Sequence, residues 1–159
     1  MNPLQMTTPT KTQIKIERGF RAPRSLVWRA FSEPELVKQW LTGPDGHTMP
    51  ECEIDFRVGG RWRYVWLIPV ERMVAYGTYK SIAPESRIVH TETFEMFPDQ
   101  ESIVETNFAE KGHETIVTML INCDSQATRD AIVQSGMDKG LETSYRNLDD
   151  LLQMETSLA

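Results

Sequence analysis

The chain has 159 residues, of which 40% are hydrophobic and 25% are charged, and its formal net charge is −6. This composition is typical of one folded domain with a full hydrophobic core, and it excludes a disordered or low-complexity chain. The acidic balance excludes nucleic acid and an anionic membrane surface as partners, because both need a basic protein surface. The two cysteines are too few for a disulfide scaffold, so we expect a cytoplasmic protein.

The N-terminal residues are polar and contain no apolar run of the kind that a signal peptide needs. We expect a disordered or frayed tail over residues 1–11, a single domain over 12–154 and a frayed C-terminus over 155–159. Apolar and polar residues alternate from Ile14 to Phe20, which predicts the first strand.

Two short helices are predicted next. Pro23 suits the first turn of a helix that continues to Phe31. Ser32 and Glu35 form a predicted capping box at the start of the second helix, which ends before Gly43.

The middle of the chain is predicted to be a series of strands separated by short turns. Strands joined by turns this short must be antiparallel, because a parallel return needs a crossover of about a dozen residues or more. Together with the first strand, this region gives a predicted sheet of about seven strands. The six candidate strands of this region cover residues 51–57, 60–68, 72–82, 87–96, 101–109 and 114–122.

The last predicted element is one long helix over residues 125–153, whose apolar residues keep to one broad face. Gly136 and Gly140 lie inside it, where each costs about 1 kcal/mol relative to alanine. They either let the helix backbone approach the sheet closely or leave room for a ligand.

Several segments resemble a known superfamily. Residues 22–31 (APRSLVWRAF) and 34–40 (PELVKQW) look like the opening of the START-like (SRPBCC) superfamily. Residues 52–64 (CEIDFRVGGRWRY) resemble the family within it that is named after the activator of the heat-shock-protein-90 ATPase, and the glycines and apolar residues of 136–152 are similar to its closing helix. The resemblance covers about residues 13–153. It implies an α+β helix-grip fold, in which a curved antiparallel sheet wraps a long C-terminal helix.

The resemblance also implies three functional alternatives. Branches of the superfamily carry lipids, hormones or aromatic polyketides between the sheet and the helix, and a few members are cyclases or hydrolases. The family name adds a co-chaperone-like interaction module that acts on a heat-shock-protein-90-type ATPase, and the sequence leaves a homodimer open.

Strand alternation predicts which side chains face the interior. In the strand that follows Gly60, Trp62, Tyr64 and Trp66 point the same way. They form either a packed core or an aromatic-lined pocket, with Trp40 at its mouth. The residues predicted to line such a pocket are Trp40, Trp62, Tyr64, Trp66, Tyr79, His90, Glu92, Phe94, Met119, Met137, Gly140, Leu141 and Tyr145.

His90 and Glu92 are the ionisable members of this set. They are two residues apart on one predicted strand and therefore share a face. On the inner face, burial would shift their pKa values and make them acid, base or ligand-binding groups. Alternatively, a slip in register turns both outward, or they pair with each other or with Tyr79.

The leading hypothesis is a non-enzymatic protein that binds a small hydrophobic or aromatic molecule. The alternative enzyme would use His90 as a general base oriented by Glu92. The chain contains no GxSxG, P-loop or GxGxxG motif, and its three histidines are scattered, so we expect no cofactor and no metal. Asp55 and Arg57 are expected to form an ion pair that holds a strand to the helical cap. The acidic residues expected on a solvated helix face are Asp138, Glu142, Asp149 and Asp150.

Overall fold

A single antiparallel sheet of eight strands forms the frame of the computed structural model, which describes residues 3–44 and 46–158. The strand order is β1-β2-β8-β7-β6-β5-β4-β3, so every pair except β2 and β8 joins strands that are consecutive in the chain. The strands are β1 (Gln5–Thr7), β2 (Gln13–Phe20), β3 (Thr48–Ile54), β4 (Arg61–Ile68), β5 (Glu71–Ala83), β6 (Arg87–Phe94), β7 (Glu101–Lys111) and β8 (Glu114–Asn122).

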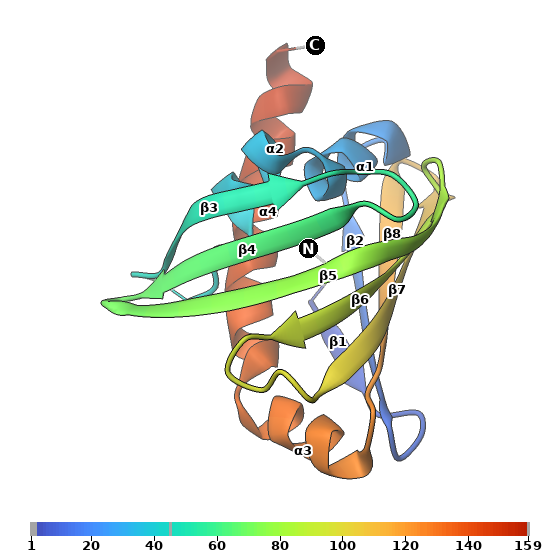
Figure 1. Ribbon diagram of the computed structural model, residues 1–159. Coiled ribbons are helices and arrows are strands. Elements are labelled where there is room, and N and C mark those ends of the chain that lie inside the picture. Colours follow the sequence, from blue (N-terminus) through green and yellow to red (C-terminus); the bar gives the residue numbers. More distant parts are fainter. Residues whose placement is uncertain (1–2, 45, 159) are drawn as a thin grey trace.

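Helices close the sheet on one side. The helices are α1 (Arg24–Ser32), α2 (Pro34–Trp40), α3 (Gln126–Gln134) and α4 (Met137–Leu158). The long α4 crosses one face of the sheet, while α1 and α2 lie towards one end and α3 lies at the other (Figure 1). The predicted α+β helix-grip fold is confirmed. Among the described residues, no helix is long and apolar enough to cross a membrane.

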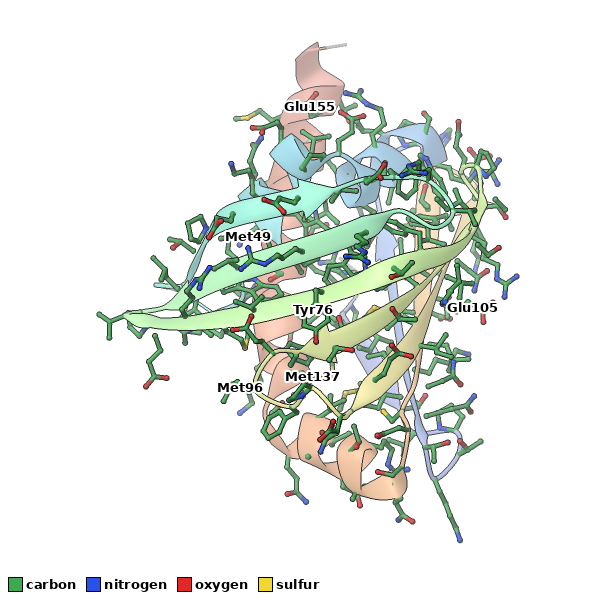
Figure 2. All side chains as sticks on the ribbon, in the orientation of Figure 1. Met49, Tyr76, Met96, Glu105, Met137 and Glu155 are labelled. Atoms are coloured by element: carbon green, nitrogen blue, oxygen red, sulfur yellow. The ribbon has the colours of Figure 1, made fainter. Side chains whose placement is uncertain are left out.

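The hydrophobic core lies between the sheet and α4 (Figure 2). Tyr145 and Leu148 of α4 are 1% and 0% exposed, and the ring of Tyr145 meets that of Phe20 on β2 edge-on at 5.1 Å. Such dense packing makes the burial of these side chains the main stabilising contribution at this interface.

A buried ion pair also joins the sheet to α4. The Arg18 guanidinium, on β2, contacts the two Asp149 carboxylate oxygens at 2.5 and 2.6 Å and lies 4.7 Å from the centre of the Phe20 ring. Arg18 is only 5% exposed. The prediction that Asp149 belongs to a solvated face is therefore wrong, because this carboxylate neutralises a buried cation.

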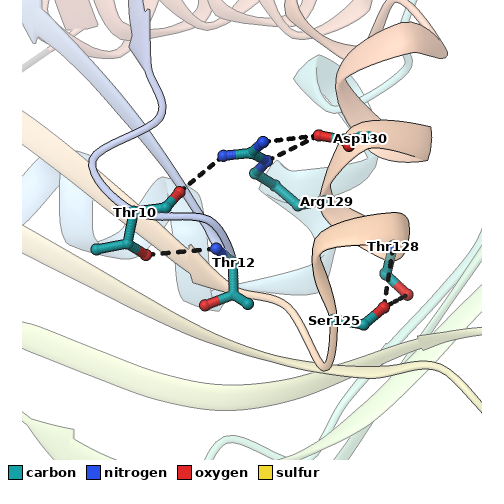
Figure 3. Close-up of polar contacts among 6 residues, drawn as sticks. All are labelled: Thr10, Thr12, Ser125, Thr128, Arg129 and Asp130. Carbon is teal, nitrogen blue, oxygen red and sulfur yellow. Dashed lines mark hydrogen bonds and ion pairs between the residues drawn. The ribbon is translucent and has the colours of Figure 1, made fainter.

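The eighth strand lies where the sequence predicts a frayed tail. Residues 5–7 pair with residues 15–17 of β2. The loop between these strands is tied to α3, because the guanidinium of Arg129 donates to the carbonyl of Thr10 at 2.7 Å (Figure 3). At the start of α3, the Ser125 hydroxyl accepts from the backbone N–H of Thr128 and caps the helix.

The predicted single C-terminal helix is divided into α3 and α4. Gly136 separates them with φ +80°, in the left-handed region that glycine favours. A Cβ added at Gly136 would meet nothing within 4 Å, so the backbone conformation rather than crowding requires glycine there. At Gly140, a Cβ would lie 3.2 Å from Cδ of Pro44. Gly140 therefore lets α4 approach the loop after α2, and not the sheet.

Two smaller predictions are also wrong. Glu33, not Ser32, is the N-cap residue of α2, and the Ser32 hydroxyl donates to the carbonyl of Trp28 at 2.9 Å instead of capping the helix. Asp55 and Arg57 do form an ion pair of 2.9 Å, but both are exposed residues of the turn between β3 and β4. Their pair fixes this turn and does not connect a strand with the helices.

Candidate functional site

A row of aromatic side chains on β4 forms part of the sheet's inner face. Trp62, Tyr64 and Trp66 occupy alternate positions, and the ring centres of neighbours along the row are 4.5 and 5.8 Å apart. The indole N–H of Trp66 donates to the carbonyl of Leu41 at 2.8 Å. This bond connects the row to the loop after α2.

The indole of Trp62 lies across Gly77, its partner on β5, and reaches β6. Its N–H donates to the carbonyl of Thr91 at 3.2 Å, while the backbone N–H of Thr78 donates to the Thr91 hydroxyl. A Cβ at Gly77 would lie 1.9 Å from the Thr91 carbonyl oxygen. Glycine is therefore required for Trp62 to occupy this position.

His90 lies on β6, half-buried on the inner face. Its ring meets the ring of Trp62 edge-on at 5.2 Å and that of Tyr79 at 6.1 Å. The Nδ1 atom is buried and has no hydrogen-bond partner among the described residues. Burial lowers the pKa of His90 to about 4, so the imidazole is neutral at pH 7.

Glu92 lies two residues further along the same face, opposite Ser102 of β7. It is half-buried, and within the part of the chain that the structure describes its carboxyl group forms neither a hydrogen bond nor an ion pair. Burial raises its pKa to about 7. No hydrogen bond between described atoms joins Glu92 to His90, so the geometry of a carboxylate that orients a general base is absent here.

The residues predicted to line a pocket fall into two groups. Four are buried and belong to the core: Trp40, Trp62, Tyr79 and Tyr145. Eight are half-buried and keep accessible surface: Tyr64, Trp66, His90, Glu92, Phe94, Met119, Met137 and Leu141. These eight residues, from β4, β6, β8 and α4, are called the inner lining below.

Trp40 does not lie at a mouth. It is 2% exposed, its N–H donates to the carbonyl of Ala30 at 2.8 Å, and its ring packs 4.8 Å from that of Phe31. The remaining predicted residue, Gly140, packs against Pro44 instead of opening space. The sequence did not show whether Trp40 is buried or lies at the rim of a pocket, because a tryptophan on a short amphipathic helix is compatible with either position.

Sequence reasoning missed two thiol groups near the inner lining, those of Cys52 and Cys123. Cys52 of β3 is half-buried opposite Tyr64, and burial raises the pKa of its thiol to about 12. Burial also raises the pKa of the Cys123 thiol. The alternation of Cys52 with Ile54 could have indicated the first of these. Within the described ranges, no group of three or more His, Cys, Asp and Glu residues could hold a metal ion.

The opposite, outer face of the sheet carries a hollow of about 580 Å³. Tyr76 is labelled on this face in Figure 2. Most of the residues that line the hollow are polar or charged, and Trp62 is its one member from the predicted pocket set. Its lining residues are Glu53, Arg61, Trp62, Arg63, Tyr76, Gly77, Thr78, Thr91, Thr93 and Glu101. The inner lining is the candidate site for a hydrophobic ligand, because six of its eight side chains are aromatic or aliphatic and pack against the core.

The fold places the chain among helix-grip proteins, and comparison with solved structures agrees. A protein from Rhodobacter sphaeroides is 27% identical, with a TM-score of 0.90 over 96% of this chain and 99% of that one. A protein from Nitrosomonas europaea (22% identical, TM-score 0.83, 93% and 98% covered) and one from Mycobacterium smegmatis (21%, 0.84, 94% and 97%) share the fold.

The family is identified by sequence. Residues 21–153 match the model of the family described as activator of Hsp90 ATPase homolog 1-like protein, and the chain belongs to this family. Among curated proteins, none matches the chain.

Proposed function

We propose that the protein binds a small hydrophobic molecule between the inner face of the sheet and α4. The observation that carries this proposal is the environment of His90 and Glu92. Both side chains keep accessible surface, yet burial is the cause of both pKa shifts. A ligand that lies against both side chains would use the surface that they keep accessible.

Unsatisfied polar groups support the same proposal. Nearly all buried polar atoms in native proteins have a hydrogen-bond partner, and those that do not need an explanation. Among the described residues, the buried side-chain atoms without such a partner are Arg24 Nε, on α1, and His90 Nδ1, on the inner face of the sheet. A ligand with one polar group would supply the partner that the chain itself does not provide.

The rest of the inner lining selects an apolar ligand. Aromatic rings from β4 and β6 give flat apolar surfaces, and Met119 and Met137 add flexible thioethers that adapt to irregular shapes. A few polar groups in a mainly apolar setting are typical of small-molecule sites.

The test is isothermal titration calorimetry with 4-phenylbutanol, 4-phenylbutylamine and 1-decanol. We expect binding with one-to-one stoichiometry for at least one of these probes. Leu141→Trp fills the proposed space and should weaken binding at least tenfold.

Met154→Trp is the matched control, because Met154 lies on the same helix and is 62% exposed. This variant should bind like the wild type. Failure of all three probes to bind, or equal affinities of the two tryptophan variants, would contradict the proposal.

A further inference from the structure

The inner face of the sheet has one ionisable acid without a partner. Apart from phenols and thiols, its buried or half-buried ionisable side chains among the described residues are Arg18, His90 and Glu92. Arg18 is neutralised by Asp149. His90 is uncharged at pH 7 because burial lowers its pKa to about 4. The remaining ionisable group without a partner is Glu92, which becomes negatively charged as the pH rises through its pKa of about 7.

Aromatic side chains of β4 and β6 share the inner face of the sheet with this carboxyl group. The ring of Trp62 passes over Gly77 to the carbonyl of Thr91, the residue before Glu92. Tyr64 lies 4.5 Å from Trp62, ring centre to ring centre. Burial is the main cause that raises the pKa of Tyr64, and the charge of Glu92 is the smallest of its further causes. Phe94 follows two residues after Glu92 on the same face.

The chemistry of this arrangement selects among ligand head groups. The faces of aromatic rings attract cations, and a cation beside a buried carboxylate compensates its lost hydration. A ligand carboxylate would instead add a second buried negative charge, which repulsion disfavours. A neutral alcohol would gain a hydrogen bond but no charge compensation.

We infer that the ligand is a hydrophobic amine, whose ammonium group pairs with Glu92 among the rings of Trp62, Tyr64 and Phe94. Its apolar part lies along Met119 and Leu141. This inference rests on the proposed function and specifies the chemical class of the ligand at the same site.

The test compares three ligands that share one hydrophobic frame: 4-phenylbutylamine, 4-phenylbutanol and 4-phenylbutyrate. At pH 8 we expect the wild type to bind the amine at least tenfold more tightly than the alcohol, and the carboxylate most weakly. Glu92→Gln should remove the preference for the amine while keeping the affinity for the alcohol. Glu95→Gln, at an exposed position just after β6, is the matched control and should keep the preference.

A second measurement uses the wild type alone. Binding of the amine at pH 7 should release protons, detected by calorimetry in two buffers of different ionisation enthalpy. The other titratable groups around Glu92 stay neutral, since burial raises the pKa values of Tyr64, Tyr79, Cys52 and Cys123 and lowers that of His90. The released protons would therefore come from Glu92.

The outcomes separate the two proposals. Alcohol binding as tight as amine binding, or amine binding without proton release, would overturn the inference about the amine and leave the hydrophobic site standing. Failure of all three compounds and of 1-decanol to bind would overturn the proposed function itself.

Discussion

Replacing Glu92 by glutamine should raise the free energy of unfolding relative to that of the wild type, and this difference should be larger at alkaline pH than at acidic pH. Burial raises the pKa of Glu92 from 4.5 to about 7. Below pH 4.5 the carboxyl group is protonated in both the folded and the unfolded state. Between about pH 4.5 and 7 the unfolded state loses this proton and the folded state keeps it, so the free energy of unfolding falls as the pH rises. The full pKa difference corresponds to about 3 kcal/mol.

Glutamine is neutral at every pH, so Glu92→Gln removes this loss. The assay is urea unfolding followed by circular dichroism at pH 5, 6, 7 and 8, for the wild type, Glu92→Gln and the exposed control Glu95→Gln. The difference in unfolding free energy between Glu92→Gln and the wild type should grow by up to about 3 kcal/mol from pH 5 to pH 8. A difference that stays constant with pH would refute the claim that this carboxyl group is desolvated.

Two further predictions concern stability. Asp149→Asn leaves the buried Arg18 without a counter-charge and should lower the free energy of unfolding by about 3–5 kcal/mol, measured by urea denaturation. The neighbouring exposed Asp150→Asn should cost less than about 0.5 kcal/mol, and equal losses would contradict the role of the ion pair. Gly136→Ala should cost about 1–2 kcal/mol through its positive φ alone. Gly77→Ala should prevent the native fold, because its Cβ would collide with a backbone carbonyl; a folded Gly77→Ala variant with unchanged stability would show that the contact is absent.

Strand alternation was sufficient to predict the inner face. Trp62, Tyr64 and Trp66 recur with the period of a strand, and His90 and Glu92 keep the same period on β6. The short turns between the strands required antiparallel pairing, so the order of neighbours from β3 to β8 followed directly. These features depend on local sequence patterns, which can be read directly from a single sequence.

Features that depend on contacts distant in sequence were not predictable in this way. The apolar period continues through Gly136, and the pattern gave no sign that the backbone there adopts a positive φ and ends α3. Asp149 looks like any surface acid until the fold brings Arg18, 131 positions away in the chain, against it. Residues 5–7 are too few and too polar to predict a strand, and they pair because β2 offers a free edge.

The central claim is that a hydrophobic ligand lies against the inner lining, and the methionine methyl groups test it most directly. Met119 and Met137 belong to the inner lining, whereas Met96 and Met154 are 68% and 62% exposed. In a protein labelled with ¹³C at these methyl groups, saturating 4-phenylbutylamine should give nuclear Overhauser effects to Met119 and Met137 and leave the Met96 and Met154 resonances in place. Effects confined to Met96 and Met154, with Met119 and Met137 unchanged, would contradict the account.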